Sequence, residues 1–166
     1  GGVGKTTTVI NLAAGLSMKG KKILVIDLDP QGNATTGLGL SNSMSSDTTI
    51  YNVLNGNKKI KEVIQKTKFE NLSLVTSNVD LSGLEIETAG DNRRAFKLKD
   101  ELTAILNDSR AMYDYILIDC PPSLSLLTIM ALVASDALVV PLQTEFFALE
   151  GLTQLMKTIE RIKSNL

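Results

Sequence analysis

Gly-Gly-Val-Gly-Lys-Thr-Thr-Thr, residues 1–8, is the stretch on which the interpretation of the whole sequence depends. Three of its first four residues are glycine, which lets successive backbone N–H groups turn towards an anion because no Cβ blocks a positive φ. A helix-compatible apolar run follows Lys5, so the positive end of a helix dipole would point at the same anion. Lys5 would supply a cation for the β- and γ-phosphates, and the Thr6 hydroxyl would be a ligand for Mg²⁺. The stretch therefore predicts the end of a phosphate-binding loop, with a flexible glycine-rich end and a solvated lysine as the alternative.

The composition is typical of one globular domain. The 166 residues are 43% hydrophobic and 21% charged, and the net charge of −1 gives no general attraction to nucleic acid. The absence of histidine excludes catalysis and metal binding by histidine, and a single cysteine, Cys120, excludes an internal disulfide and fits a reducing compartment. We find no apolar run of membrane-spanning length and no secretory signal, so we expect a cytoplasmic protein.

Hydrophobic periodicity predicts strands that alternate with helices. Continuous apolar runs typical of strands buried on both faces of a parallel sheet occur at residues 22–28, 113–119 and 137–142, with a further candidate at 72–76. Helical spacing of apolar residues predicts helices at residues 5–19, 96–106, 123–134 and 149–162, and two short helices near Ile50 and Ile60. Gly20 should terminate the first helix, and Ser123 is the candidate N-cap of the helix that ends at 134. Residues 34–48 read as a loop. This alternation predicts an α/β fold: a doubly wound, mostly parallel sheet with helices on both faces.

Three aspartates follow the predicted strands. Asp27 and Asp29 belong to Asp-Leu-Asp-Pro-Gln-Gly-Asn at residues 27–33, and Asp119 ends a second apolar run. Ligands of open α/β sheets bind outside the carboxyl ends of strands, so these acids should converge on the phosphate-binding loop. Asp119 has the form of a Walker B acid that holds Mg²⁺, an ion that favours few carboxylates together with phosphate oxygens and waters. Asp29 is the candidate for orienting or activating a water molecule, and an exposed strand terminator is the alternative for each acid.

These segments together resemble the ParA/Soj chromosome- and plasmid-partition ATPases, members of the deviant Walker A class that also includes MinD. The resemblance covers residues 1–7, 27–33, 113–123 (Tyr-Asp-Tyr-Ile-Leu-Ile-Asp-Cys-Pro-Pro-Ser) and 141–151, and so nearly the whole sequence. It implies the P-loop NTPase fold, use of ATP and Mg²⁺, a homodimer that forms with ATP, and slow ATP hydrolysis. It further implies non-specific DNA binding by the dimer, a ParB-like partner that stimulates hydrolysis, a nucleoid-associated location and no membrane partner.

The resemblance also implies roles for matching residues. The residues implied to bind the phosphates are Gly1, Gly2, Val3, Gly4, Lys5, Thr6 and Thr7. Thr6, Asp27 and Asp119 are the implied Mg²⁺ ligands, and Asp29 and Lys5 the implied catalytic residues. The family's signature lysine would stand just before Gly1, and the adenine-contacting and most DNA-binding residues would lie after position 166. We therefore expect residues 1–166 to be a single P-loop ATPase domain that lacks its first strand and its C-terminal part, and hydrolysis by this segment alone stays open.

Other functions are compatible with the same residues. The alternatives are a MinD-like positioning ATPase, a nucleotide-binding regulator without hydrolysis, and a phosphoryl or amide-forming synthetase, although no substrate motif of a synthetase is recognisable. The lysines between Lys58 and Lys68 are more typical of a solvated helix face than of a DNA contact. Cys120 has no histidine or metal-ligand partner and is expected to be a small buried apolar residue.

Overall fold

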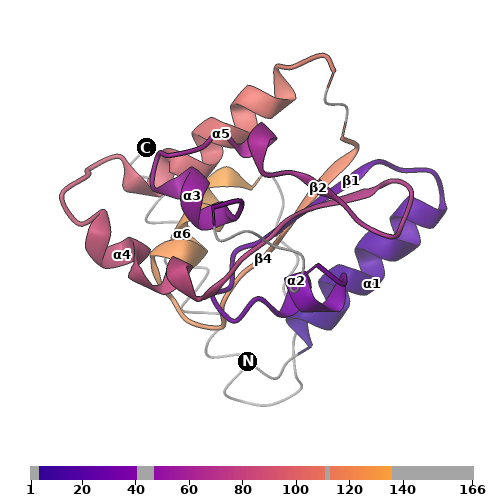
Figure 1. Cartoon of the computed structure of the whole chain (residues 1–166), viewed down its shortest axis with the longest axis horizontal. Helices are drawn as coiled ribbons and strands as arrows, with labels where there is room; N and C mark the ends of the chain where they lie inside the picture. Colours follow the sequence, from indigo (N-terminus) through magenta and orange to yellow (C-terminus); the bar gives the residue numbers. More distant parts are fainter. Residues whose placement is uncertain (1–3, 41–46, 111–112, 136–166) are drawn as a thin grey trace.

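A central sheet organises the described part of the protein, which in this computed structural model comprises residues 4–40, 47–110 and 113–135 (Figure 1). Its four strands lie in the order β2-β3-β1-β4. Their bounds are Ile23–Asp27 for β1, Gln65–Lys66 for β2, Leu72–Val75 for β3 and Tyr115–Asp119 for β4. Strands β3, β1 and β4 are parallel, and β2 joins β3 in the antiparallel sense. The prediction of a mostly parallel sheet is therefore confirmed.

Helices and helical turns connect the strands. In chain order they are α1 (Lys5–Met18), α2 (Asn33–Gly37), α3 (Ile50–Leu54), η1 (Ile60–Glu62), η2 (Val79–Gly83), α4 (Leu84–Glu87), η3 (Arg94–Phe96), α5 (Lys97–Leu106) and α6 (Leu126–Ala134), where η marks a 3₁₀ helix. The predicted end of the first helix is confirmed, because Gly20 follows α1 with φ of 83° and its N–H donates to the carbonyl of Ser17 at 3.0 Å.

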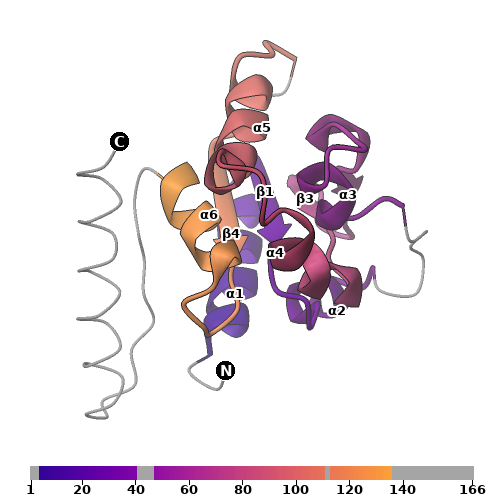
Figure 2. The same cartoon turned by 90° about the vertical axis from the view of Figure 1, so that its left-hand side faces the viewer.

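Strand β1 separates two apolar clusters, one on each face of the sheet. All five of its residues are buried, and their side chains alternate between the faces. Ile23 and Val25 contact the cluster under α1, whereas Leu24 and Ile26 belong to the larger cluster that includes α3, α5 and α6. Helices α5 and α6 lie side by side over this second face (Figure 2). Burial on both faces explains the uninterrupted apolar run in β1 and confirms the doubly wound arrangement.

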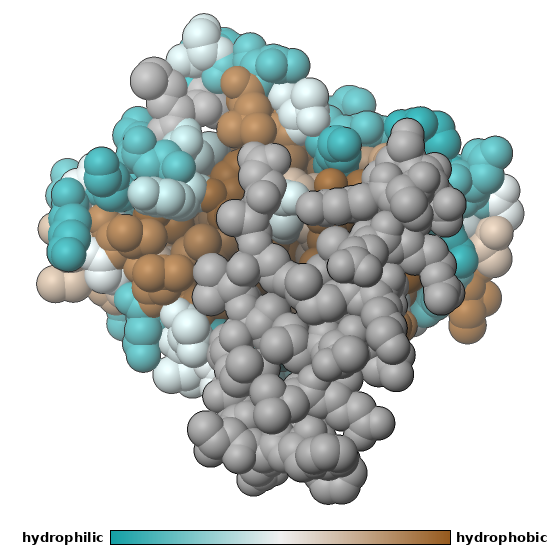
Figure 3. Space-filling model, turned by 180° about the vertical axis from the view of Figure 1, so that it is seen from behind, coloured by the Kyte–Doolittle hydropathy of each residue, from teal (hydrophilic) through white to brown (hydrophobic). Residues whose placement is uncertain are grey.

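Strand β4 and helix α1 are less buried than the sequence predicts. Strand β4 pairs with β1, yet Tyr115 at its start is 47% exposed and the next three residues are only partly buried. Seen from behind, hydrophobic surface is visible on the side of α1 (Figure 3), and Leu12 and Met18 of this helix are 41% and 79% exposed. Helix α1 thus buries only part of its apolar surface.

Several predicted boundaries were wrong. Near Ile60 the chain forms a single 3₁₀ turn instead of a second short helix, and the region predicted as a loop begins with α2. Helix α6 begins at Leu126, and its N-cap residue is Ser125, in the extended conformation, and not Ser123; the Ser125 side chain makes no capping hydrogen bond. The strand and helix predicted at 137–142 and 149–162 lie outside the described residues. Among the described residues, no helix is long and apolar enough to cross a membrane.

Candidate functional site

The carboxyl ends of β1 and β4 place two of the predicted acids side by side. Asp27 and Asp119 are the last residues of these parallel strands and are direct partners in the register. The backbone N–H of Leu28 donates to the carbonyl of Asp119 at 2.7 Å, which holds the two strand ends together beyond the ladder. Parallel pairing therefore brings together acids that are far apart in the sequence, as the strand-end argument predicted.

The start of α1 contacts this edge through Thr6. The Thr6 hydroxyl donates a hydrogen bond to Oδ2 of Asp119 at 2.7 Å, although 113 positions separate the two residues. Gly4 precedes the helix with φ of 72°, a left-handed conformation that suits glycine. Of the residues predicted to bind phosphate, Gly1, Gly2 and Val3 lie outside the described residues, and Thr7 is exposed on the first turn of α1. The described part of the predicted loop thus lies against the acid that ends β4.

Asp119 is buried in a polar environment that is incompletely paired. Only 1% of the residue is exposed, and its Oδ1 atom has no hydrogen-bond partner among the described residues. Burial raises the pKa of the Asp119 carboxyl, whereas the hydrogen bond from Thr6 and the charge of Lys5 lower it and the charge of Asp29 raises it again. A buried carboxylate oxygen without a donor is costly unless a cation or a ligand pairs with it.

The unpaired oxygen and the neighbouring hydroxyl fit a magnesium ion. Both are hard oxygen donors, and Mg²⁺ typically takes one or two carboxylates in addition to phosphate oxygens and waters. The parts of the chain that the structure describes hold no group of three or more acidic, histidine or cysteine side chains arranged for a metal. A site built from Thr6, Asp119 and nucleotide phosphates is compatible with this finding, whereas a protein cage of several carboxylates is not.

Asp27 has a different environment from Asp119. It is fully buried, and both of its carboxylate oxygens are already paired. Its Oδ1 accepts from the N–H of Asp29 at 3.1 Å, and its Oδ2 accepts from the N–H and the hydroxyl of Thr35 at 2.8 and 2.7 Å. Burial raises the pKa of Asp27 to about 6 even though the hydrogen bonds from Thr35 and Asp29 lower it. These three hydrogen bonds leave at most one lone pair, on Oδ1, for a metal, and direct metal binding by Asp27 stays a prediction.

Asp29 lies in the turn that follows β1. It is 5% exposed, and its Oδ1 accepts a hydrogen bond from the N–H of Gln31 at 2.9 Å. Its backbone carbonyl accepts from the hydroxyl of Ser77 at 2.8 Å and from the N–H of Gly32 at 2.9 Å. The register pair of Asp27 and Asp119, with the contacts of Asp29 to Asp27 and of Thr6 to Asp119, places these predicted residues at one edge of the sheet.

Sequence reasoning missed Thr35 and Ser77. Both are buried and both contact the predicted acids, but Thr35 was assigned to a loop and Ser77 to no function. The only local signal was the position of Thr35 three residues after Gly32, in the first turn of α2, where N–H groups need acceptors. Nothing local to Ser77 pointed to the site.

Cys120 follows Asp119 and is partly buried. Burial raises the pKa of its thiol to about 12, and the neighbouring charge of Asp119 adds to this rise. A thiol that stays protonated is a poor nucleophile, so the expected role as a small apolar residue agrees with its environment.

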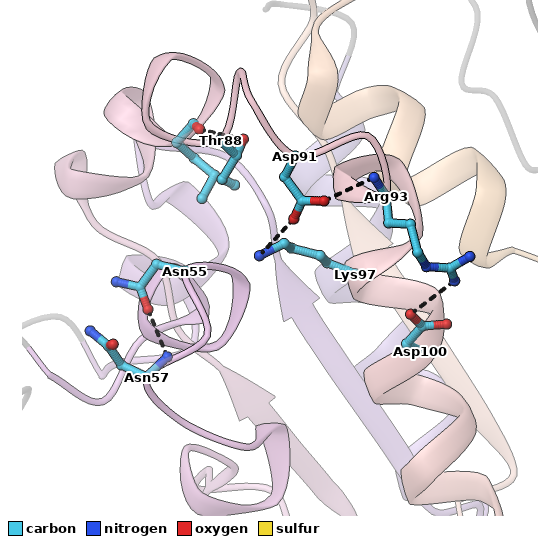
Figure 4. A network of polar contacts seen from close by, with 8 residues as sticks. Asn55, Asn57, Thr88, Asp91, Arg93, Lys97 and Asp100 are labelled. Atoms are coloured by element: carbon cyan, nitrogen blue, oxygen red, sulfur yellow. Dashed lines mark hydrogen bonds and ion pairs between the residues drawn. The ribbon is translucent and has the colours of Figure 1, made fainter.

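One cavity among the described residues lies away from this edge. It has a volume of about 430 Å³ and is lined by residues of the α3, α4 and α5 regions (Figure 4). Its charged groups pair with each other: Lys97 with Asp91 at 3.3 Å and, beside it, Arg93 with Asp100 at 3.3 Å. A smaller cavity of about 190 Å³ lies between Pro30 and Pro121, in the loops that follow β1 and β4. The smaller cavity is lined by residues one and two positions after Asp29 and Asp119, and none of the three aspartates lines either cavity, so volume alone does not identify the site.

Known proteins share both the sequence and the fold. A family model described as "AAA domain" matches residues 1–166. The chain is 51% identical to the chromosome partitioning protein ParA of Caulobacter vibrioides, and the match covers the whole chain and 61% of that relative. It is 46% identical to the sporulation initiation inhibitor protein Soj of Bacillus subtilis, again over the whole chain and over 64% of that relative. The chain therefore spans about three fifths of the length of these curated relatives.

Solved structures agree with the sequence comparisons. The crystal structure of cobyrinic acid a,c-diamide synthase from Mycobacterium smegmatis with a bound ATP analogue and magnesium matches with a TM-score of 0.88 and 36% identity, over 99% of this chain and 65% of that one. A plasmid partition protein from Borrelia burgdorferi matches with a TM-score of 0.84 and 32% identity, over 98% of this chain and 69% of that one. The predicted fold class is thereby confirmed, and so is the resemblance to the partition proteins.

Proposed function

Since the chain belongs to the AAA domain family, we propose that it is the nucleotide-binding core of a ParA/Soj-type partition ATPase, which hydrolyses ATP with Mg²⁺. The observation that carries the proposal is the contact of the Thr6 hydroxyl with Asp119, whose second carboxylate oxygen is buried and unpaired. The similarity to proteins named for chromosome partitioning supports the same function. Residues 1–166 would form a single domain of a longer protein.

The described side chains divide the work of such a site. Thr6 and Asp119 would hold Mg²⁺, which supplies charge neutralisation at the phosphates. Lys5 would place its ammonium against the β- and γ-phosphates, and the N–H groups of residues 1–4 would line the same anion. Asp29 would accept a hydrogen bond from the attacking water and orient it in line. Phosphoryl transfer needs mainly positioning and electrostatic stabilisation, so a site without histidine is adequate.

Association is the second part of the proposal. We expect ATP to favour a homodimer, the dimer to bind DNA without sequence preference, and a ParB-like partner to stimulate hydrolysis. Coupling of nucleotide state to dimer state would make the protein a switch that ATP sets and hydrolysis resets. The support is the similarity to the partition proteins, because the regions expected to contact DNA are not part of residues 1–166.

The test uses the intact protein. ATP turnover should require Mg²⁺, and DNA binding should require ATP. Asp29→Ala should retain ATP binding, lose turnover and accumulate the ATP-bound dimer, whereas Asp80→Ala at an exposed position should behave like the unaltered protein. Rapid turnover by the Asp29→Ala variant would refute the assigned role of this residue.

An amide-forming synthetase is the competing function that a specific observation favours. The solved structure of cobyrinic acid a,c-diamide synthase from Mycobacterium smegmatis shares the fold of this chain at 36% sequence identity. A synthetase would turn over ATP only when a carboxylic acid and an amide donor are supplied, whereas a partition ATPase would respond to DNA and to its protein partner. Binding of ATP without turnover under either condition would instead indicate a regulator.

A further inference from the structure

Thr35 connects the carboxylate of Asp27 to the segment that follows β3. It is 2% exposed, and its hydroxyl both donates and accepts a hydrogen bond. The hydroxyl donates to Oδ2 of Asp27 at 2.7 Å and accepts from the backbone N–H of Ser77 at 3.0 Å. Its single proton and one lone pair are used, so a side chain without a hydroxyl would leave both partners unsatisfied.

Ser77 carries the connection on to Asp29. Its hydroxyl donates to the backbone carbonyl of Asp29 at 2.8 Å, and its own backbone carbonyl lies where a Cβ on Gly32 would approach to 3.3 Å. The turn from Asp29 to Gly32 therefore rests directly on Ser77. The hydrogen bonds form a buried path from Asp27 through Thr35 and Ser77 to the backbone of Asp29.

This path fixes the acid at a point where the turn itself provides few restraints. The Asp29 side chain is held by one local hydrogen bond, from the N–H of Gln31, and that bond moves with the turn. The bonds to Ser77 and Asp27 tie the Asp29 backbone to the segment directly after β3 and to the last residue of β1, and these two strands are paired in the sheet. Rigid elements position a reacting group better than a loop does, and a displacement of about 1 Å can cost about a hundredfold in rate.

We propose that Thr35 is a positioning residue for Asp29: its hydroxyl joins Asp27 to Ser77 and so holds the Asp29 turn in the geometry required for hydrolysis. The inference depends on the proposed function, in which Asp29 orients the attacking water. Thr35 does not touch the phosphates in this scheme, so its loss should act on the rate of the chemical step and not on nucleotide affinity.

The experiment compares variants of the intact protein. In Thr35→Val the hydroxyl is replaced by a methyl group of similar size; kcat should fall about tenfold to a hundredfold, while the Kd for ATP with Mg²⁺ changes less than about threefold. Thr35→Ser keeps the hydroxyl and should retain kcat within about threefold. Thr36→Val alters an exposed neighbour on the same short helix and is the matched control.

Amide hydrogen exchange gives a readout that is independent of turnover. The N–H of Ser77 and that of Gln31 should lose protection in Thr35→Val and keep it in Thr35→Ser and Thr36→Val. Should Thr35→Val fail to fold, Ser77→Ala replaces it, because this variant keeps the bonds of Thr35 and removes only the bond to the Asp29 carbonyl. It should show the same selective loss of kcat.

The outcomes separate this inference from the proposed function. An intact protein without Mg²⁺-dependent ATP turnover would refute the proposed function, while loss of Ser77 and Gln31 protection in Thr35→Val would still support the path itself. Normal turnover in an active protein bearing Thr35→Val or Ser77→Ala would overturn the inference. So would a Thr35→Ser variant as impaired as Thr35→Val, or a loss of ATP affinity equal to the loss of kcat.

Discussion

At the scale of single residues, the two strand-end acids are buried equally but paired differently. Asp27 has a donor on each oxygen, all from its own strand end and from α2, whereas Asp119 has one donor from α1 and one unpaired oxygen. A carboxylate whose oxygens are satisfied inside the protein is suited to holding the fold, and one with a spare oxygen is suited to an added cation. Because Asp27 and Asp119 are partners in the register, the carboxylate suited to holding the fold and the one suited to a cation lie side by side at one edge of the sheet.

The raised pKa of Asp27 predicts a specific pH dependence of stability. Its pKa rises from 3.8 to about 6 on folding, so the folded state binds the proton more tightly, and the resulting stability is complete below pH 3.8 and lost as the pH rises through 6. Relative to Asp27→Asn, the free energy of unfolding of the unaltered protein should fall by about 2.4 kcal/mol between pH 4 and pH 7. Urea unfolding of the intact protein without nucleotide or metal measures this difference.

A surface acid provides the opposite sign as a control. The N–H of Arg93 lowers the pKa of Asp91, so stability from this acid is present above its unfolded pKa and is lost as the pH falls. Asp91→Asn removes this contribution, so the difference in the free energy of unfolding between the unaltered protein and Asp91→Asn should become smaller as the pH falls. Equal pH profiles for the unaltered protein and Asp27→Asn would contradict the environment described for Asp27.

Cys120 yields a second prediction at this scale. With a pKa of about 12 against an ordinary 9.0, its thiolate fraction near pH 8 is lower by about a thousandfold in the folded protein. Iodoacetamide should therefore alkylate Cys120 about a thousandfold more slowly in the folded protein than in the protein unfolded by urea. Mass spectrometry of the peptide that contains Cys120 measures both rates. Similar rates in both states would mean that the thiol is accessible and ionises normally.

Single residues were predictable where a local pattern carried the information. Thr6 and Asp119 each belong to a short motif, and the rule that ligands gather at strand ends was enough to place them together. Thr35 and Ser77 lie 8 and 48 positions from the acids they bind; the position of Thr35 after Gly32 is a weak local signal, and Ser77 has none. Buried polar networks depend on tertiary contacts, which hydrophobic periodicity does not encode.

At the scale of elements, segments with a readable hydrophobic period were predicted, the short helix α3 among them, whereas α2 was not. Strand β1 is buried on both faces, and α5 has an apolar stripe with charges on its outer side, so each has a clear period. Helix α2 has five residues, too few for a period to be read or for an isolated helix to form. It is held instead by the Asp27 carboxylate at its N-terminus and by its packing against α1.

Gly32 tests how closely this short helix and its turn are packed. Its φ is +66°, and an added Cβ would lie 3.3 Å from the Ser77 carbonyl oxygen, whereas Gly39 has φ of +81° with nothing within 4 Å. An alanine at either position costs about 1–2 kcal/mol for the left-handed conformation. Gly32→Ala should be destabilised more than Gly39→Ala, by up to about 1 kcal/mol, and should also lose turnover. Denaturant unfolding measures the stability of the two variants, and ATPase assays measure their turnover. Equal losses of stability would show that the close approach of Gly32 to the Ser77 carbonyl is unimportant.

At the scale of the whole molecule, the phosphate-binding loop and Asp119 should respond to nucleotide as one site. A ligand that binds only the folded state adds about 2.7 kcal/mol of stability at a concentration of one hundred times its Kd. We therefore expect ATP with Mg²⁺ to raise the thermal midpoint of the intact protein by several degrees, and ATP with a chelator to raise it less. The difference between the two conditions isolates the metal, because the phosphates are present in both.

In the proposed site the unpaired oxygen of Asp119 would contribute the protein's charge to the metal, so this difference should depend on Asp119. Asp119→Asn should retain stabilisation by ATP alone and lose most of the additional stabilisation by Mg²⁺. Glu70→Gln, at an exposed acid that precedes β3 and so lies at the opposite edge of the sheet, should respond like the unaltered protein. If Asp119→Asn kept the full response to Mg²⁺, the ion would bind elsewhere, and the contact between Thr6 and Asp119 would only fasten α1 to β4.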